Sequence, residues 1–229
     1  MDKHVYVFNG HGALDLLSCL DLYNGTKKTL PELICNKYCC VFNRKGQKTW
    51  SRSGSTKNME SNFSRYLGEI GDTSRLVRVE IYDRAQGPDS WELFEKQGAG
   101  FFVDMSETSF NIYVVLFNVL SEEQIVKLWT LFSDVIEMNY MVSFSLDVRK
   151  HPEIYMYGVR ISPANIMSDK FYNETELEIV DKLYALRMHK TYDLEDVFPV
   201  CIVTGKNTVR ELGYISKKTI DSRASLFSK

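Results

Sequence analysis

The sequence predicts an α+β fold in which helices pack against a mixed or mainly antiparallel sheet. Three observations support this prediction. Segments with the apolar pattern of strands outnumber amphipathic helical segments, and several strands are separated by connections too short for a crossover helix. In residues 109–148, a strand, a helix cap, an amphipathic helix and a second strand follow one another, so this segment is the expected core.

The central segment contains the run from Ile112 to Leu116, whose continuous apolar character is typical of a strand buried on both faces. Ser121 and Gln124 then have the spacing of a capping box, in which each side chain satisfies a backbone N–H at the start of a helix. The apolar residues that follow recur at the spacing of one helical face, so this helix should lie flat on the sheet: Ile125, Leu128, Trp129, Phe132, Val135 and Ile136.

The N-terminal part of the chain predicts a strand over residues 4–8 that ends at the turn dipeptide Asn9-Gly10. A short amphipathic helix is expected next, over residues 14–25. Residues 30–42 suit either a second strand or a buried turn of helix, and their periodicity does not distinguish the two.

The middle of the chain is expected to alternate between strands and helices. Residues 43–58 are basic and polar and are predicted to form a mobile loop. Residues 63–70 suggest a helical turn, and residues 76–82 alternate between apolar and polar as a strand with one wet face does. A helix over 88–98 and a short strand over 101–103 complete this part.

The C-terminal part predicts a strand over 154–161, a helix with a capping box over 173–189 and a last buried strand over 198–203. No repeat of solenoid period is visible. Residues 1–205 are therefore interpreted as a single domain, followed by a weakly ordered tail over 206–229.

Composition limits the classes of function. The 229 residues carry a formal net charge of −2, so the chain as a whole has no attraction to nucleic acid or to an anionic membrane, and either partner would need a local patch. No segment approaches the roughly 18 to 20 unbroken apolar residues of a spanning helix. The five cysteines, an odd number, argue against a disulfide framework. We therefore expect a cytoplasmic protein without membrane association, and its oligomeric state stays open.

His11 is the strongest candidate for an enzymatic role, because a histidine between glycines directly after a strand can approach a substrate as a general base. The same glycines also serve a tight turn, and no nucleophile motif accompanies the histidine. We therefore expect no catalytic residue. A small hydrolase that uses His11 as its base ranks third among the hypotheses for function, after the two binding functions described below.

Two clusters suggest metal or carboxylate chemistry, but both favour a simpler interpretation. Cys35, Cys39 and Cys40 lack the second pair of close ligands that a zinc site needs, so buried free thiols account for them. Acidic residues between the expected strands are typical of a solvated face, and no phosphate-binding glycine loop accompanies them: Asp83, Asp89, Glu92, Glu95, Asp104 and Glu107. No metal and no cofactor are expected.

Two charged surfaces could bind a macromolecule. In the basic loop, an aromatic ring stands among cations, a combination that binds single-stranded nucleic acid by stacking and phosphate contact; a solvated loop with one ring turned inward explains the same pattern. Its residues are Arg44, Lys45, Lys48, Trp50 and Arg52. The helix over 173–189 is acidic and could meet a basic partner, as a nucleic-acid mimic or a nuclease inhibitor does, through Glu174, Glu178 and Asp181.

The arrangement around Trp91-Glu92 and the segment SEEQIVKLWTLFSDVI resembles small bacterial immunity proteins, the antidotes paired with polymorphic toxins. The resemblance covers residues 76–148: a strand, a short helix with Trp-Glu, a strand pair and a helix with Leu-Trp-x-Leu-Phe. It implies a protein that occludes a toxin's active site without turnover, through Trp91, Glu92 or the acidic helix. The alternative is a phage-encoded or host-encoded inhibitor, or a nucleic-acid-associated factor that uses the basic loop.

Overall fold

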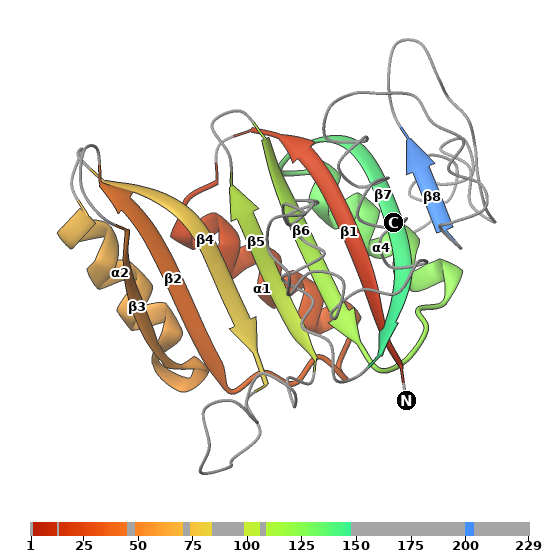
Figure 1. Ribbon diagram of the computed structural model, residues 1–229, viewed down its shortest axis with the longest axis horizontal. Coiled ribbons are helices and arrows are strands. Elements are labelled where there is room, and N and C mark those ends of the chain that lie inside the picture. The colour runs from red at the N-terminus through yellow and green to blue at the C-terminus, as the bar shows by residue number, and fades with distance from the viewer. Residues whose placement is uncertain are drawn as a thin grey trace, which may run out of the picture.

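The computed structural model describes residues 2–12, 14–44, 49–70, 74–83, 99–105, 109–147 and 200–203. The strands in these residues form one eight-stranded sheet in the order β3-β2-β4-β5-β6-β1-β7-β8, and every neighbouring pair is antiparallel (Figure 1). The strands are β1 (Asp2–His11), β2 (Lys37–Arg44), β3 (Trp50–Ser55), β4 (Ser74–Tyr82), β5 (Gly100–Met105), β6 (Ser109–Leu116), β7 (Glu137–Asp147) and β8 (Val200–Val203).

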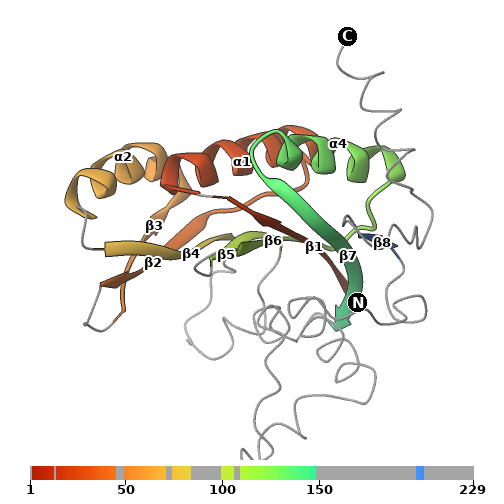
Figure 2. The same cartoon turned by 90° about the horizontal axis from the view of Figure 1, so that it is seen from above.

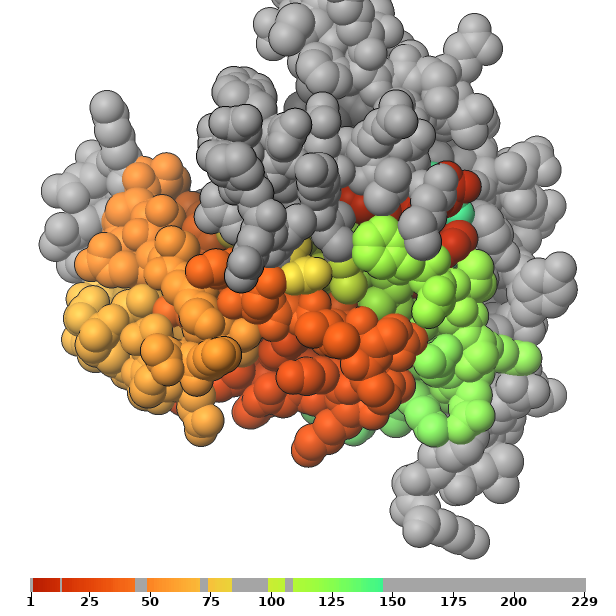
Figure 3. Space-filling view, turned by 90° about the horizontal axis from the view of Figure 1, so that it is seen from below, coloured from red at the N-terminus to blue at the C-terminus, as the bar shows by residue number. Residues whose placement is uncertain are grey.

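The helices described are α1 (Leu16–Thr29), α2 (Met59–Ile70) and α4 (Glu122–Ser133), with a short 3-10 helix η1 (Thr56–Asn58) before α2. Figure 2 shows α1, α2 and α4 on the same side of the sheet, and in the space-filling view of Figure 3 they adjoin in the order α2, α1, α4. The sheet with its helical layer confirms the α+β fold.

The connections explain why the helices share one face. Helix α2 joins β3 to β4 and passes over β2, while α4 joins β6 to β7 and passes over β1. Helix α1 joins β1 to β2, and in the sheet the strands β6, β5 and β4 lie between these two strands. Each helix therefore spans the strands that separate its two neighbours in sequence and buries its apolar face against them.

The main core lies between this helical layer and the sheet. Phe8 of β1 meets Phe132 of α4 edge to face, with 4.7 Å between the ring centroids, so the helix lies flat on the sheet as expected. Strand β6 is buried on both faces, as its apolar run predicts. Its residues Tyr113 and Val115, which alternate with the core residues, are also buried.

The capping box at α4 is confirmed. Ser121 Oγ accepts a hydrogen bond from the Gln124 backbone N at 3.3 Å, and Gln124 Oε1 accepts one from the Ser121 backbone N at 2.9 Å. The helix ends at Ser133, which leaves Val135 exposed although Ile136 is buried. The expected helical face thus stops one turn earlier than its periodicity suggests.

The predicted turn at Asn9-Gly10 is wrong. Strand β1 continues to His11, and the pairing with β7 shifts its register between Asn9 and Gly10, which is a β-bulge. A Cβ atom on Gly10 would stand 2.7 Å from the backbone oxygen of Glu137, so the glycine permits a close approach of two strands rather than a turn. Helix α1 likewise runs past Gly25, to Thr29.

The predicted loop over residues 43–58 is also corrected, because β2 extends to Arg44 and residues 50–58 form β3 and η1. Strand β3 pairs with β2 along its whole length, from Trp50 opposite Phe42 to Ser55 opposite Lys37. Residues 30–42 accordingly end in a strand, which resolves the earlier ambiguity.

Three expected elements lie outside the described residues: the helix over 88–98, the strand over 154–161 and the helix over 173–189. So does the tail over 206–229, while the last expected strand is described as β8. Among the described helices, none combines the length and the apolar character that crossing a bilayer requires.

Candidate functional site

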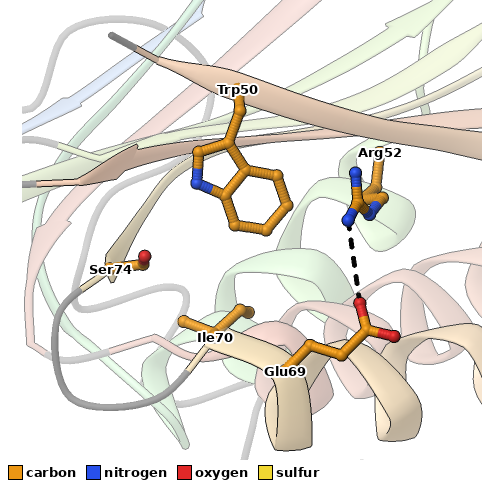
Figure 4. A pocket seen from close by; sticks show the side chains of 5 residues that line it. All are labelled: Trp50, Arg52, Glu69, Ile70 and Ser74. Atoms are coloured by element: carbon orange, nitrogen blue, oxygen red, sulfur yellow. Dashed lines mark ion pairs between the residues drawn. The ribbon is translucent and has the colours of Figure 1, made fainter. Parts of the chain in front are cut away.

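A cavity of about 330 Å³ opens at the edge of the sheet, where β3 lies over the end of α2. Figure 4 shows the side chains that surround it: Trp50, Arg52, Glu69, Ile70 and Ser74. They come from β3, from the last turn of α2 and from the first residue of β4. The cavity is therefore built by three elements that meet only in the folded chain.

The strand register explains why Trp50 and Arg52 face the helix. Trp50 pairs with Phe42, and Arg52 pairs with Cys40. Phe42 and Cys40 both belong to the core under the helices. Because paired residues in an antiparallel sheet point to the same face, Trp50 and Arg52 point toward α2 as well.

The aromatic wall of the cavity is the Trp50 ring, which stacks on a buried ring outside the lining. Phe42 is fully buried, and the Trp50 ring stacks on it with 4.3 Å between centroids and 23° between planes. The Arg52 guanidinium carbon lies 4.8 Å from the centroid of the same Trp50 ring, within the range of a cation–π contact. The Trp50 indole therefore stacks on the buried Phe42 ring and also contacts the Arg52 guanidinium.

The charged side of the cavity centres on Glu69. Arg52 Nη2 lies 3.8 Å from Glu69 Oε2, and Arg65 Nε lies 3.6 Å from Glu69 Oε1. These side chains are about half exposed, so each ion pair contributes at most about 1 kcal/mol to folding. One carboxylate therefore orients two cations without holding either of them tightly.

The segment around the cavity is strongly basic compared with the rest of the chain. Residues 37–70 contain seven Lys or Arg and two Glu, a formal charge of +5, whereas the whole chain carries −2. The other residues therefore sum to −7. Residues 37–70 are therefore a basic segment in an otherwise acidic chain.

A buried hydroxyl network fixes α2 on the sheet next to the cavity. Asn62 Nδ2 donates to the Tyr38 hydroxyl at 2.8 Å, and the Tyr38 and Tyr66 hydroxyls are 3.1 Å apart. Burial raises the pKa of Tyr38, so this hydroxyl stays protonated and can donate to Tyr66. Because Tyr38 also lies against Gly54, the network ties β2, β3 and α2 together.

The structure brings together two of the five residues predicted for nucleic-acid binding. Trp50 and Arg52 line the cavity. Arg44 ends β2, where its backbone pairs with Ser74, and Lys45 and Lys48 lie outside the described residues.

Three of the cavity's residues were missed by sequence reasoning: Glu69, Ile70 and Ser74. Only the i,i+4 spacing of Arg65 and Glu69 hinted at Glu69. The residues proposed to bind a protein partner, Trp91, Glu92, Glu174, Glu178 and Asp181, all lie outside the described residues.

His11 does not lie in the turn that the sequence predicts. It is the last residue of β1, where it pairs with Ser109 of β6 and Glu137 of β7. The backbone approach offered by a glycine-flanked loop after the strand is therefore missing at this position.

Cys35, Cys39 and Cys40 form no disulfide, and Cys35 and Cys40 are buried while Cys39 is half-buried. Burial raises the pKa of Cys35 to about 12, which keeps its thiol neutral and unreactive. In the part of the chain that the structure describes, no three His, Cys, Asp or Glu side chains gather as metal ligands would. Of the acidic run, Asp83 accepts a hydrogen bond from Asn36, and Asp104 stands opposite Arg78 in the sheet.

A second polar cluster, also missed by sequence reasoning, lies on the face of the sheet away from the helices. Asn9 Nδ2 donates to Asn111 Oδ1 at 2.8 Å and to the Phe110 carbonyl at 3.1 Å. Asn139 Nδ2 donates to Asn9 Oδ1 at 2.8 Å. These amides link three adjacent strands at the bulge, which is a structural role, whereas the edge cavity combines exposure with mixed chemistry.

Comparison with models of protein families, with curated proteins and with solved structures finds no significant match for this chain.

Proposed function

We propose that this chain is a non-enzymatic binding protein that neutralises a protein partner, as a toxin immunity protein does, and that it holds the partner at the surface formed by β3 and α2. The observation that supports this proposal is the cavity at the edge of the sheet, where Trp50 and Arg52 stand together beside Glu69. The resemblance of residues 76–148 to immunity proteins supports the same class of function.

The composition of the cavity suits a protein partner. Trp and Arg are among the residues that contribute most to protein–protein binding, particularly where a partner side chain fills a pocket beside them. A volume of about 330 Å³ is at the small end of ligand pockets and has room for an anchoring side chain. Phe42 and the Tyr38 network hold the walls in place, so little ordering is needed on binding.

Nucleic acid is the less favoured partner for the same surface. Phosphates and bases can use the same contacts with Arg52, Arg65 and Trp50 as an acidic protein with an aromatic side chain can. The residues outside 37–70 carry a formal charge of −7, however, which repels a polyanion that continues beyond this segment. A compact acidic protein surface needs to meet only residues 37–70, whose formal charge of +5 speeds the encounter.

Because immunity proteins are paired with their toxins, the test uses the protein encoded by the gene next to the one that encodes this chain. That protein is produced in a host with and without this chain, and host growth and formation of a 1:1 complex are measured. Arg52→Glu should abolish protection and weaken the complex by at least about tenfold, which corresponds to 1.4 kcal/mol. Lys127→Glu is the matched control, because Lys127 is a similarly exposed cation that pairs with Glu123 on α4.

Two results would contradict the proposal. One is a complex or a rescue of growth that Arg52→Glu and Lys127→Glu affect equally. The other is the lack of any protein complex together with salt-dependent binding of a single-stranded oligonucleotide that Arg52→Glu abolishes, which would establish the nucleic-acid alternative.

A further inference from the structure

Strand β3 is the last strand on its side of the described sheet, and β2 is its one neighbour there. Its central residues Ser51, Arg52 and Ser53 are exposed. A strand at the edge of a sheet leaves every second backbone N–H and C=O without a partner strand, so β3 presents donors and acceptors to an incoming chain.

The side chains of β3 leave this edge accessible. Ser51, Ser53 and Ser55 alternate with the cavity residues and point to the opposite face of the sheet, and Gly54 has no side chain. The described part of β3 has no proline and no lysine, two of the residue types that commonly block edge pairing. Its one charged residue, Arg52, turns toward Glu69 on α2 rather than along the edge (Figure 4).

We propose that the partner contributes an extended acidic segment that pairs with β3 and adds a strand to the sheet. This inference rests on the proposed function in that it takes the partner to be a protein. Side chains of an added strand alternate between the two faces, so every second one lies above α2, next to the cavity, and the others lie beside the serines.

The charges define the sequence of this segment. Arg52, Lys57 and Arg65 lie along β3, η1 and α2, and the whole segment 37–70 carries a formal charge of +5. Carboxylates in the added strand can approach Arg52 and Arg65 in place of Glu69, which holds them only at 3.8 and 3.6 Å. An acidic strand therefore gains charge complementarity, whereas a basic strand is repelled.

The cavity defines an anchor within the segment. The Trp50 ring and Ile70 offer apolar surface, and the volume of about 330 Å³ accommodates one aromatic side chain. A side chain placed there can stack with the indole and exclude water from the contacts that Arg52 makes with the partner's carboxylates. We therefore assign the partner segment acidic residues at every second position, on the cavity side where Arg52 and Arg65 lie, with one aromatic residue among them at the cavity.

The experiment uses the full chain and a fluorescent seven-residue peptide, Glu-Thr-Phe-Thr-Glu-Thr-Glu, whose acidic and aromatic side chains share one face of a strand. Binding is followed by fluorescence anisotropy and by amide hydrogen exchange. The peptide should bind, and exchange in residues 50–55 should slow by at least about tenfold while exchange in α4 stays unchanged. Methylation of alternate peptide nitrogens, which removes backbone donors, should weaken binding by about tenfold or more. Replacement of the peptide's acidic residues by lysine should weaken binding to a similar extent. The Arg52→Glu variant should also bind the peptide about tenfold more weakly, whereas the Lys127→Glu control should bind it as the unchanged chain does.

The inference is overturned if the peptide does not bind at about 1 mM, if the methylated peptide binds equally well, or if protection appears elsewhere than in β3. Failure of the proposed function is recognised separately, in the growth and complex assays with the adjacent gene's product. A chain that neutralises that protein while its β3 amides exchange as before keeps the proposed function and loses this inference.

Discussion

Gly10 is a residue at which two strand backbones approach each other closely. A Cβ atom there would lie 2.7 Å from the backbone oxygen of Glu137, and the neighbouring strand cannot move away without breaking its pairing with β1. Gly10→Ala should therefore lower the free energy of unfolding by about 1–3 kcal/mol, as overpacking does. Urea denaturation of the variant measures this loss, and an unchanged midpoint would show that the bulge can widen.

The same position shows why local sequence signals fail at single residues. Asn9-Gly10 has the composition of a hairpin turn. The Asn9 side chain instead finds its partners at Phe110, Asn111 and Asn139, more than 100 residues away in the chain. Those hydrogen bonds exist only after β6 and β7 have paired with β1, so no pattern within a short window can reveal them.

At the scale of the element, α2 offers a direct test of helix propensity beside the cavity. Gly68 lies in its last turn, and a Cβ atom there would meet no other atom within 4 Å. Gly68→Ala should raise the free energy of unfolding by about 0.5–1 kcal/mol, because alanine restricts the unfolded chain and favours the helix. Thermal and urea unfolding measure the gain, and an equal or lower stability would indicate that Gly68 is strained by a contact in solution.

Elements with an apolar periodicity or a cap were predictable, whereas β3 was not. Helix α4 is predictable because the capping residues Ser121 and Gln124 and a regular apolar face all occur within twelve residues. Strand β3 lies at the edge and exposes three of its six residues, so it needs few apolar side chains and its sequence is that of a loop. The candidate site was predicted only in part for this reason, since its walls come from β3, α2 and β4 together.

At the scale of the whole molecule, the fold class followed from the number of strands and their short connections, and the all-antiparallel pairing agrees with it. The order of the strands was beyond reach from sequence. Strands β1 and β2 follow each other in the chain, with α1 between them, yet β6, β5 and β4 separate them in the sheet. Such long-range pairing depends on which apolar faces fit together and not on any local pattern.

Buried cysteine thiols and tyrosine hydroxyls in the core predict that the folded protein loses stability at alkaline pH. Burial raises the pKa of the thiols of Cys19, Cys35 and Cys40 above the ordinary value of 9.0, and that of Cys35 reaches about 12. Burial likewise raises the pKa of Tyr6 and Tyr23 above 10.0. In each case the unfolded chain releases its proton at a lower pH than the folded chain does.

Stabilisation from these groups is therefore complete below about pH 9 and is lost progressively as the pH rises toward the folded-state values, because the unfolded state then binds fewer protons than the folded state. Urea unfolding at about pH 7.5, 9 and 10.5 should show a falling free energy of unfolding above pH 9. In Cys35→Ala the decline should be shallower, since one of the raised groups is gone, even though the variant is less stable at neutral pH. An equally steep decline in that variant would mean that the Cys35 thiol reaches solvent before the molecule unfolds, through loss of its contacts with the carbonyls of Ile81 and Ala99.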